Sequence, residues 1–339
     1  VRCTSWADME AYSVYGVRNR GSGFSRVVQA RRCPKRAHEN ARIVHPTGTL
    51  MADKPATADA AWHNRMYNNR ALVPDNALYL ARWAEDSARV RREEPCTLDV
   101  PYGDTPAETL DVFPAAAGAQ PAPVLLFIHG GYWRALDKSD HSFVAPAFTR
   151  EGVCVVVPNY ALCPAVTIPQ IVMQMVRSVA WTYRHIARFG GDPRRITVAG
   201  HSAGGQLAAM MLACLWPVHA PDLPADTARS ALAISGLHDL EPLRHTSFLQ
   251  PTIGLTPEQV AMASPARLPA PSQGKLVTVV GGEESEEYLR QNRLIRERWG
   301  ARRVPVCEAL AGRHHFSALD ALAEPGHRLQ GLALGLLRA

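Results

Sequence analysis

The stretch Arg195-Ile-Thr-Val-Ala-Gly-His-Ser-Ala-Gly-Gly-Gln206 decides the fold. Its first five residues form a mainly β-branched and apolar run typical of a buried strand, and the Ala-, Leu- and Met-rich run over 203–215 is typical of a helix. Between the two, Gly200 and Gly204 flank Ser202 in the pattern G-x-S-x-G, and glycine has no Cβ atom to clash in a tight turn. The stretch therefore predicts a strand, a sharp turn that exposes Ser202, and a helix.

The same alternation of short apolar runs and helical patterns continues on both sides of this stretch. Continuous apolar runs such as 123–129 and 153–158 suit strands that are buried on both faces of a mainly parallel sheet. A short turn at 103–105 predicts an antiparallel hairpin at the sheet edge. We therefore expect an α/β fold with an eight-stranded, mostly parallel sheet and helices on both faces. The expected strands are 97–101, 109–113, 123–129, 153–158, 195–200, 231–235, 276–281 and 304–309, and the expected helices are 74–91, 140–150, 171–188, 203–215, 257–264, 286–298 and 326–338.

The formal net charge of the 339-residue chain is +6, and its position matters more than its size. Residues 1–50 hold nine basic and three acidic residues, so 51–339 is charge-balanced and offers no electrostatic basis for binding nucleic acid. We expect 1–50 to be a disordered leader or a mis-assigned start, with Met51 as the true start and an Arg-rich transit peptide as the alternative. We expect 51–94 to be a helical segment packed on the core, and 95–339 to be the catalytic domain.

Other features of the sequence exclude further classes. The seven cysteines form no C-x-x-C pair and no zinc pattern, which predicts free thiols in a reducing compartment. No run of 18 apolar residues is present, and the N-terminal residues lack the apolar core of a secretory signal, so we expect a cytoplasmic protein with no membrane partner. Neither a phosphate-binding loop nor a dinucleotide-binding fingerprint nor a zinc-protease motif occurs, so we expect no cofactor and no metal.

Two consecutive glycines follow the expected strand that ends near residue 129. They belong to the segment His129-Gly-Gly-Tyr-Trp133, and glycines at such a point can turn backbone N–H groups toward one reacting oxygen. Acyl transfer needs these donors, because its tetrahedral intermediate carries a negative oxygen. We expect this oxyanion hole to be formed by Gly130, Gly131 and Tyr132 together with Ala203, which directly follows the serine.

A serine nucleophile also needs a histidine base and an acid, and in this layout they follow in the order serine, acid, histidine. His314 and His315 both follow the last expected strand. The candidates for the acid are Glu284, in the loop after the seventh strand, and Asp239, after the sixth. We choose Glu284 because the usual position is after the seventh strand, and glutamate can orient an imidazole as well as aspartate. Asp239 is the alternative.

These motifs together resemble α/β-hydrolases of the arylformamidase (kynurenine formamidase) and hormone-sensitive-lipase-like esterase group. The resemblance covers about residues 60–339, and its terminal His-Phe pair favours His315 as the base. The family usually has aspartate where this chain has Glu284, so the acid departs from the pattern. The stretches that carry the resemblance are 67–70, 129–133, 158–164, 190–195, 200–205, 280–288 and 315–316.

The resemblance implies a serine hydrolase that cleaves a carboxylic ester or an N-aryl formamide through an acyl-enzyme. Two alternatives stay open: a short-chain carboxylesterase without formamidase activity, and a catalytically inactive binding protein with the same fold. We expect a small-molecule substrate, and a homodimer is compatible with the sequence. Tyr132 and Trp133, with Trp181, are candidates for the substrate pocket, and the long connection 240–272 is a candidate cap over the site.

Overall fold

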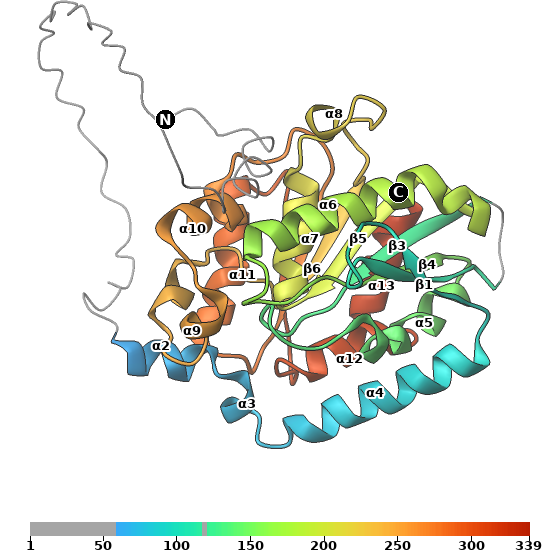
Figure 1. Cartoon of the computed structure of the whole chain (residues 1–339). Helices are drawn as coiled ribbons and strands as arrows, with labels where there is room; N and C mark the ends of the chain where they lie inside the picture. Colours follow the sequence, from blue (N-terminus) through green and yellow to red (C-terminus); the bar gives the residue numbers. More distant parts are fainter. Residues whose placement is uncertain (1–58, 117–120) are drawn as a thin grey trace, which may run out of the picture.

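The computed structural model describes residues 59–116 and 121–339, and it contains one eight-stranded sheet (Figure 1). The leader or mis-assigned start expected at 1–50 lies outside the described residues. Along the sheet the strands follow the order β1-β2-β4-β3-β5-β6-β7-β8. The strands are β1 (Thr97–Pro101), β2 (Thr109–Phe113), β3 (Ala122–Ile128), β4 (Cys154–Pro158), β5 (Gly191–His201), β6 (Ser230–Ile234), β7 (Leu276–Gly281) and β8 (Val306–Leu310).

The sheet is antiparallel only at its first edge. β2 pairs antiparallel with β1 and with β4, as expected for an edge hairpin, and all other neighbours pair parallel. The predicted α/β fold with a mostly parallel sheet is confirmed. Because parallel strands all point the same way, the loops that follow β3, β5, β6, β7 and β8 gather at one edge of the sheet, where such folds bind ligands.

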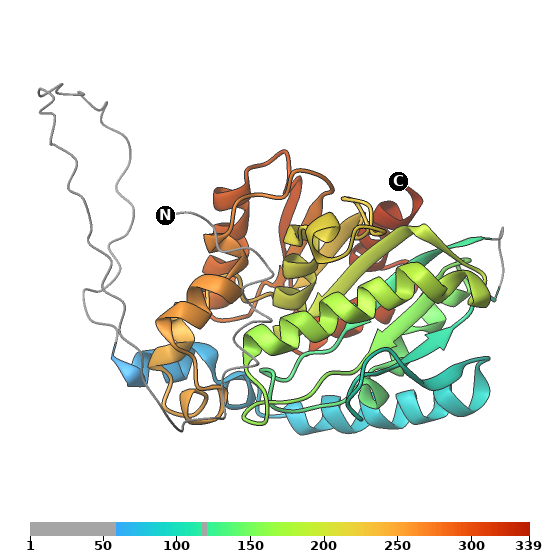
Figure 2. The ribbon, with the colours of Figure 1, turned by 45° about the horizontal axis from the view of Figure 1, so that its top comes forward.

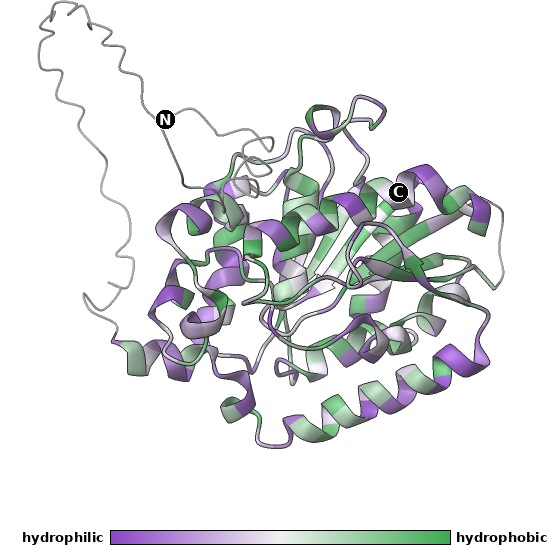
Figure 3. Ribbon diagram, in the orientation of Figure 1, coloured by the Kyte–Doolittle hydropathy of each residue, from purple (hydrophilic) through white to green (hydrophobic). Residues whose placement is uncertain are grey.

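Successive residues of β3 point into two different cores. Val124 and Leu126 pack with residues of α6 (Ile168–His185) and α7 (Ala203–Ala213), whereas Leu125 and Phe127 pack with residues of α12 (Ser317–Ala323) and α13 (Arg328–Arg338). This is the period-two alternation of a strand with apolar residues on both faces. Figure 2 shows α6 along one face of the sheet. Figure 3 shows that the strands at the centre are mostly apolar and that the helices covering them also carry polar residues.

The prediction of one continuous helix over 140–150 is wrong. The chain there forms two short 3₁₀ turns, η1 (Lys138–Asp140) and η2 (Ser142–Val144), and a single helical turn, α5 (Pro146–Thr149). Proline cannot donate a backbone hydrogen bond, so Pro146 cannot lie in the interior of one continuous helix and starts a new turn instead. The remaining helical elements are α2 (Ala60–Tyr67), α3 (Asn69–Leu72), α4 (Asn76–Glu93), η3 (Ile186–Phe189), α8 (Trp216–His219), η4 (Glu241–His245), α9 (Gln250–Ile253), α10 (Pro257–Ala263), η5 (Pro265–Arg267) and α11 (Glu286–Trp299).

Helices α2 to α4 run along one side of the molecule and are tied to it by buried polar contacts (lower part of Figure 1). The Tyr67 hydroxyl, at the end of α2, donates to Glu287 Oε2 of α11 over 2.7 Å. Trp83 of α4 is 2% exposed, and its Nε1 donates to Asp320 Oδ1 of α12 over 2.7 Å. These two contacts hold the short helix α3 between them, at the edge of the sheet where the candidate site lies.

Candidate active site

Ser202 lies at the sharp turn between β5 and α7. Its backbone angles, φ 57° and ψ −118°, are unfavourable for a residue with a side chain, and such a conformation costs on the order of 1–3 kcal/mol. The neighbouring glycines are required, because a Cβ on Gly200 would lie 2.1 Å from Gly204 O and one on Gly204 would lie 2.0 Å from Ile128 O. The turn predicted from G-x-S-x-G is therefore present and presents Ser202 at the end of the sheet.

Glu284 and His315 form a buried pair next to this turn. Their Oε2 and Nδ1 atoms are 2.7 Å apart, and the side chains are 1% and 6% exposed. The other carboxylate oxygen of Glu284 accepts from the Gly281 N–H over 2.7 Å and from the Ser235 hydroxyl. Because the carboxylate accepts from Nδ1, that nitrogen carries a proton and Nε2 of the neutral ring is left as the basic atom.

The alternative residues for the acid and the base have other contacts. Asp239 Oδ1 accepts from Arg267 Nε over 3.0 Å and from the Glu241 N–H over 3.2 Å, so it caps a turn and pairs with a surface arginine. His314 Nδ1 accepts from the N–H groups of Phe316 and Ser317, and its Nε2 lies 3.2 Å from Tyr79 Oη. The structure thus brings Glu284 and His315 together, and neither alternative contacts this pair.

His201 contributes a contact that sequence reasoning missed. Its Nε2 donates to the backbone carbonyl of His315 over 2.9 Å, and the two ring centroids are 4.6 Å apart. Burial, and then the neighbouring charge of His315, lower the pKa of His201 well below its ordinary value. His201 is therefore a neutral hydrogen-bond donor that holds the backbone of His315 against the serine turn.

The loop after β3 is held by its carbonyl groups. The Gly130 carbonyl accepts from His129 Nδ1 over 2.8 Å and from Tyr160 Oη over 3.1 Å. A peptide group is planar and trans, so anchoring this carbonyl turns the N–H of Gly131 the opposite way. Gly131 has φ +101°, and a Cβ there would lie 2.0 Å from Ala135 O. Within the part of the chain that the structure describes, the Gly131 N–H has no acceptor, as an oxyanion donor requires.

The hydroxyl groups of Tyr132 and Tyr288 and the side-chain amide of Asn69 connect this loop to α11 and α3. Tyr132 Oη donates to the Tyr67 carbonyl over 2.6 Å and lies 2.6 Å from Tyr288 Oη. Since the single hydroxyl proton of Tyr132 goes to that carbonyl, Tyr288 donates to Tyr132. The Tyr288 oxygen then accepts from Asn69 Nδ2 over 2.8 Å. Sequence reasoning missed Tyr288 and Asn69, although both lie in stretches that carried the family resemblance.

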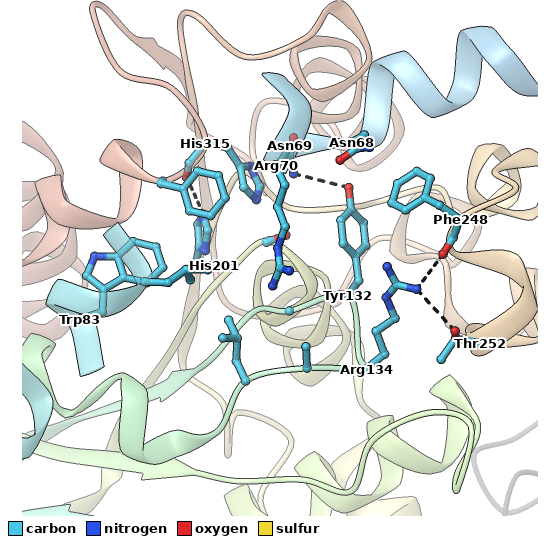
Figure 4. Close-up of a pocket in the computed structure, with 16 residues that line it drawn as sticks. Asn68, Asn69, Arg70, Trp83, Tyr132, Arg134, His201, Phe248, Thr252 and His315 are labelled. Carbon is cyan, nitrogen blue, oxygen red and sulfur yellow. Dashed lines mark hydrogen bonds between the residues drawn. The ribbon is translucent and has the colours of Figure 1, made fainter. Parts of the chain in front are cut away.

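These residues surround a cavity of about 440 Å³ (Figure 4). Of the expected site residues, Ser202, His315, Gly131 and Tyr132 line it. Trp133 does not: it is fully buried, and its Nε1 donates to Gln206 Oε1 over 3.1 Å. The remaining lining residues come from α3 and the residue before it, α4, the loop after β3, the end of β5, the connection 240–272 and the loop after β8: Asn68, Asn69, Arg70, Leu80, Trp83, Arg134, Ala135, Leu136, His201, Phe248, Thr252 and Phe316.

Glu284, which contacts His315 from behind, lies outside this lining, and so do Trp181, Gly130 and Ala203. Trp181 is on α6, and its ring lies 6.2 Å from that of Phe189 of η3, centroid to centroid, with the two planes tilted by 40°. Gly130 contributes the anchored carbonyl described above. Ala203 is fully buried as the first residue of α7, and in the described residues its N–H has no acceptor, as is usual for the first turn of a helix.

The described residues contain no group of His, Cys, Asp or Glu side chains that could hold a metal ion. The five cysteines among them are free thiols, and burial raises the pKa of Cys154 to about 12 and that of Cys163 to about 11. In this part of the chain no helix has both the length and the apolar character needed to cross a membrane.

Comparisons with known proteins identify the family to which this fold belongs. A family model described as "alpha/beta hydrolase fold" matches residues 125–277. Kynurenine formamidase of Danio rerio is 29% identical over 255 residues, which are 74% of this chain and 84% of the relative. Esterase LipC of Mycobacterium tuberculosis is 30% identical over 256 residues, which are 69% of this chain and 63% of the relative.

Solved structures of other proteins have the same fold. The crystal structure of a proposed thioesterase from Silicibacter sp. superimposes with a TM-score of 0.70 at 30% identity, covering 81% of this chain and 98% of the other. An esterase from Pyrobaculum calidifontis has the same fold, with a TM-score of 0.58 at 17% identity over 80% of this chain and 97% of the other.

The chain belongs to the α/β-hydrolase family. Within this family it is an enzyme, a hydrolase similar to arylformamidases and to esterases of the hormone-sensitive-lipase-like group.

Proposed function

We propose that this enzyme cleaves a small carboxylic ester or an N-aryl formamide through an acyl-enzyme on Ser202, with His315 as the base and Glu284 as the acid. The observation that carries the proposal is the 2.7 Å contact between Glu284 Oε2 and His315 Nδ1 beside the strained serine turn. This contact leaves Nε2 of His315 free to take the serine proton.

The reaction then proceeds in two steps. His315 Nε2 removes the Ser202 proton as the serine oxygen attacks the substrate carbonyl, and the N–H groups of Gly131, Tyr132 and Ala203 stabilise the negative oxygen that forms. The protonated imidazole, stabilised by Glu284, gives its proton to the leaving alcohol or amine. A water molecule deprotonated by His315 then attacks the acyl carbon. The bond from that carbon to the Ser202 oxygen breaks, the imidazolium returns its proton to this oxygen, and the acid is released.

The substrate is tested by a direct comparison. The kcat/KM values for N-formyl-L-kynurenine and p-nitrophenyl acetate are measured on wild type and on Ser202→Ala. We expect wild type to hydrolyse the formamide and the ester, and we expect Ser202→Ala to lose several orders of magnitude in kcat on both. Activity on the ester alone would make the chain a short-chain carboxylesterase. Equal inactivity of wild type and Ser202→Ala on both substrates would favour a binding protein and overturn the proposal.

We further propose a cytoplasmic setting and a small-molecule substrate, without a nucleic-acid or membrane partner. The free thiols support the first point, because disulfides rarely persist in the cytosol. The homodimer that is compatible with the sequence stays a prediction, which sedimentation equilibrium of the purified enzyme would test.

A further inference from the structure

The charged side chains that line the active-site cavity, among the residues the structure describes, are all basic. Arg70 and Arg134 line it, and the lining contains no aspartate or glutamate. The nearest acid in the proposed machinery is Glu284, and its carboxylate oxygens are already occupied by His315, Gly281 and Ser235. The cavity therefore holds two arginine charges without a carboxylate facing them.

Arg134 is held in place by neutral groups. One guanidinium nitrogen donates to the Phe248 carbonyl over 2.6 Å and lies 3.4 Å from Thr252 Oγ1. The guanidinium carbon also lies 5.7 Å from the centre of the Phe248 ring. These contacts orient the group and leave its charge unbalanced. Burial, and then the positive charge of Arg70, lower the pKa of Arg134 below its ordinary value.

Arg70 is positioned by the residue before it. Asn69 is anchored by its amide on Tyr288 Oη at 2.8 Å and on Tyr132 Oη at 3.4 Å, and this fixes the backbone from which Arg70 extends. Figure 4 shows the Arg70 side chain reaching into the cavity between His201 and Tyr132. In the described part of the chain no side chain or carbonyl accepts a hydrogen bond from its guanidinium.

Two like charges that face one cavity repel each other, and an anion between them converts that repulsion into attraction. Guanidinium groups present paired N–H donors that match the two oxygens of a carboxylate. The volume of about 440 Å³ is in the range of small-molecule sites and leaves room for a group beyond the reacting carbonyl.

We propose that Arg70 and Arg134 form an anion subsite that binds a carboxylate on the substrate while its ester or formamide carbonyl lies at Ser202. The proposal rests on the function proposed above, since both use the same cavity. It assigns the enzyme a preferred substrate class: small acyl compounds whose other end carries a carboxylate, rather than neutral esters.

A matched substrate pair tests the subsite. The substrates are 4-acetoxybenzoate and its neutral methyl ester, and kcat/KM is measured for both on wild type, Arg70→Gln, Arg134→Gln and the control Arg65→Gln. Arg65 is an exposed arginine of α2 that does not line the cavity. We expect the anionic-to-neutral ratio to fall at least about tenfold in the first two variants and to stay at the wild-type value in the control. Arg70→Lys, which keeps the charge, should restore part of the preference.

A binding measurement separates failure of the subsite from failure of the catalytic proposal. Calorimetry gives the Kd of 4-hydroxybenzoate for Ser202→Ala and for Ser202→Ala with Arg70→Gln, and we expect at least about tenfold weaker binding in the double variant. If wild type hydrolyses both esters through Ser202 with the same ratio as Arg70→Gln, the subsite is wrong and the catalytic proposal stands. If wild type hydrolyses neither ester, the calorimetric comparison decides the subsite alone: an equal Kd in the two proteins overturns it.

Discussion

At the scale of single residues, the contacts of Glu284 explain how a glutamate, one methylene group longer than an aspartate, can hold the His315 imidazole. Its carboxylate accepts from the Gly281 N–H and the Ser235 hydroxyl on one oxygen and from His315 on the other. The backbone N–H and the hydroxyl fix the longer side chain, so the extra methylene group does not loosen the imidazole contact.

Replacing Glu284 by glutamine should therefore lower kcat by about 10³- to 10⁴-fold, by analogy with other triad acids. The amide has nearly the same shape but can present an NH₂ group to His315 Nδ1, which favours the wrong tautomer of the ring. Steady-state kinetics with p-nitrophenyl acetate measures the effect. Asp239→Asn is the matched control and should keep kcat within a few-fold of wild type, because among the described residues the Asp239 carboxylate accepts only from Arg267 and the Glu241 N–H. A large loss in the control with a small loss in Glu284→Gln would move the role to Asp239.

The residues that could be predicted from the sequence are those at the carboxyl ends of strands. The order of the strands alone places Ser202 and Glu284 in loops at one edge of the sheet, and it limits the base to His314 or His315. Asn69 could not be placed in this way, because it reaches the site from a segment outside the sheet through tertiary contacts.

At the scale of elements, the loop after β3 depends on the tyrosine that follows β4. Tyr160 Oη donates to the carbonyls of His129 and Gly130, both over 3.1 Å, and the Tyr160 ring stacks on the His129 imidazole at a centroid distance of 4.2 Å. One side chain thus anchors two successive peptide groups of the loop.

Tyr160→Phe removes both hydrogen bonds and keeps the ring. We expect kcat to fall about tenfold with a smaller change in KM, because the N–H of Gly131 stabilises the transition state more than the bound substrate. The measurement is kcat and KM on one ester, with the melting temperature recorded to confirm folding. Tyr183→Phe on α6 is the control, since none of the described residues accepts a hydrogen bond from its hydroxyl. An equal effect on KM and none on kcat would contradict a role for Tyr160 in loop orientation.

Element prediction succeeded where one pattern dominates the segment. β3 and β4 are continuous apolar runs, and their bounds agree with the predicted 123–129 and 153–158 to within one residue. The prediction of one helix over 140–150 is wrong because it followed the apolar residues of this stretch alone. Asp137 caps a short 3₁₀ turn and Pro146 starts a new helical turn, so the backbone is divided into short elements. Local hydrogen bonding therefore prevailed over periodicity.

At the scale of the whole molecule, burial of histidines links the stability of the fold to pH. His141 and His238 are fully buried, and burial lowers the pKa of each to about 3. Burial also lowers the pKa values of His129 and His201. In the unfolded chain these imidazoles titrate near their ordinary value of about 6.5. Between about pH 6.5 and pH 3 the unfolded state therefore binds more protons than the folded state, and the free energy of unfolding falls as the pH falls.

His238 allows this to be tested at one residue, because neither of its ring nitrogens has a hydrogen-bond partner among the described residues. A histidine with so low a folded-state pKa contributes a slope of about 1.4 kcal/mol per pH unit once the unfolded chain is protonated. We expect His238→Leu to remove that contribution, so that its free energy of unfolding declines less steeply than that of wild type between pH 6 and pH 4.5. Urea denaturation at several pH values measures both slopes. At pH 7.5 the contribution is absent in both proteins, so any stability difference there reports packing alone. Parallel slopes for the two proteins would mean that His238 takes up its proton in the folded state as readily as in the unfolded chain.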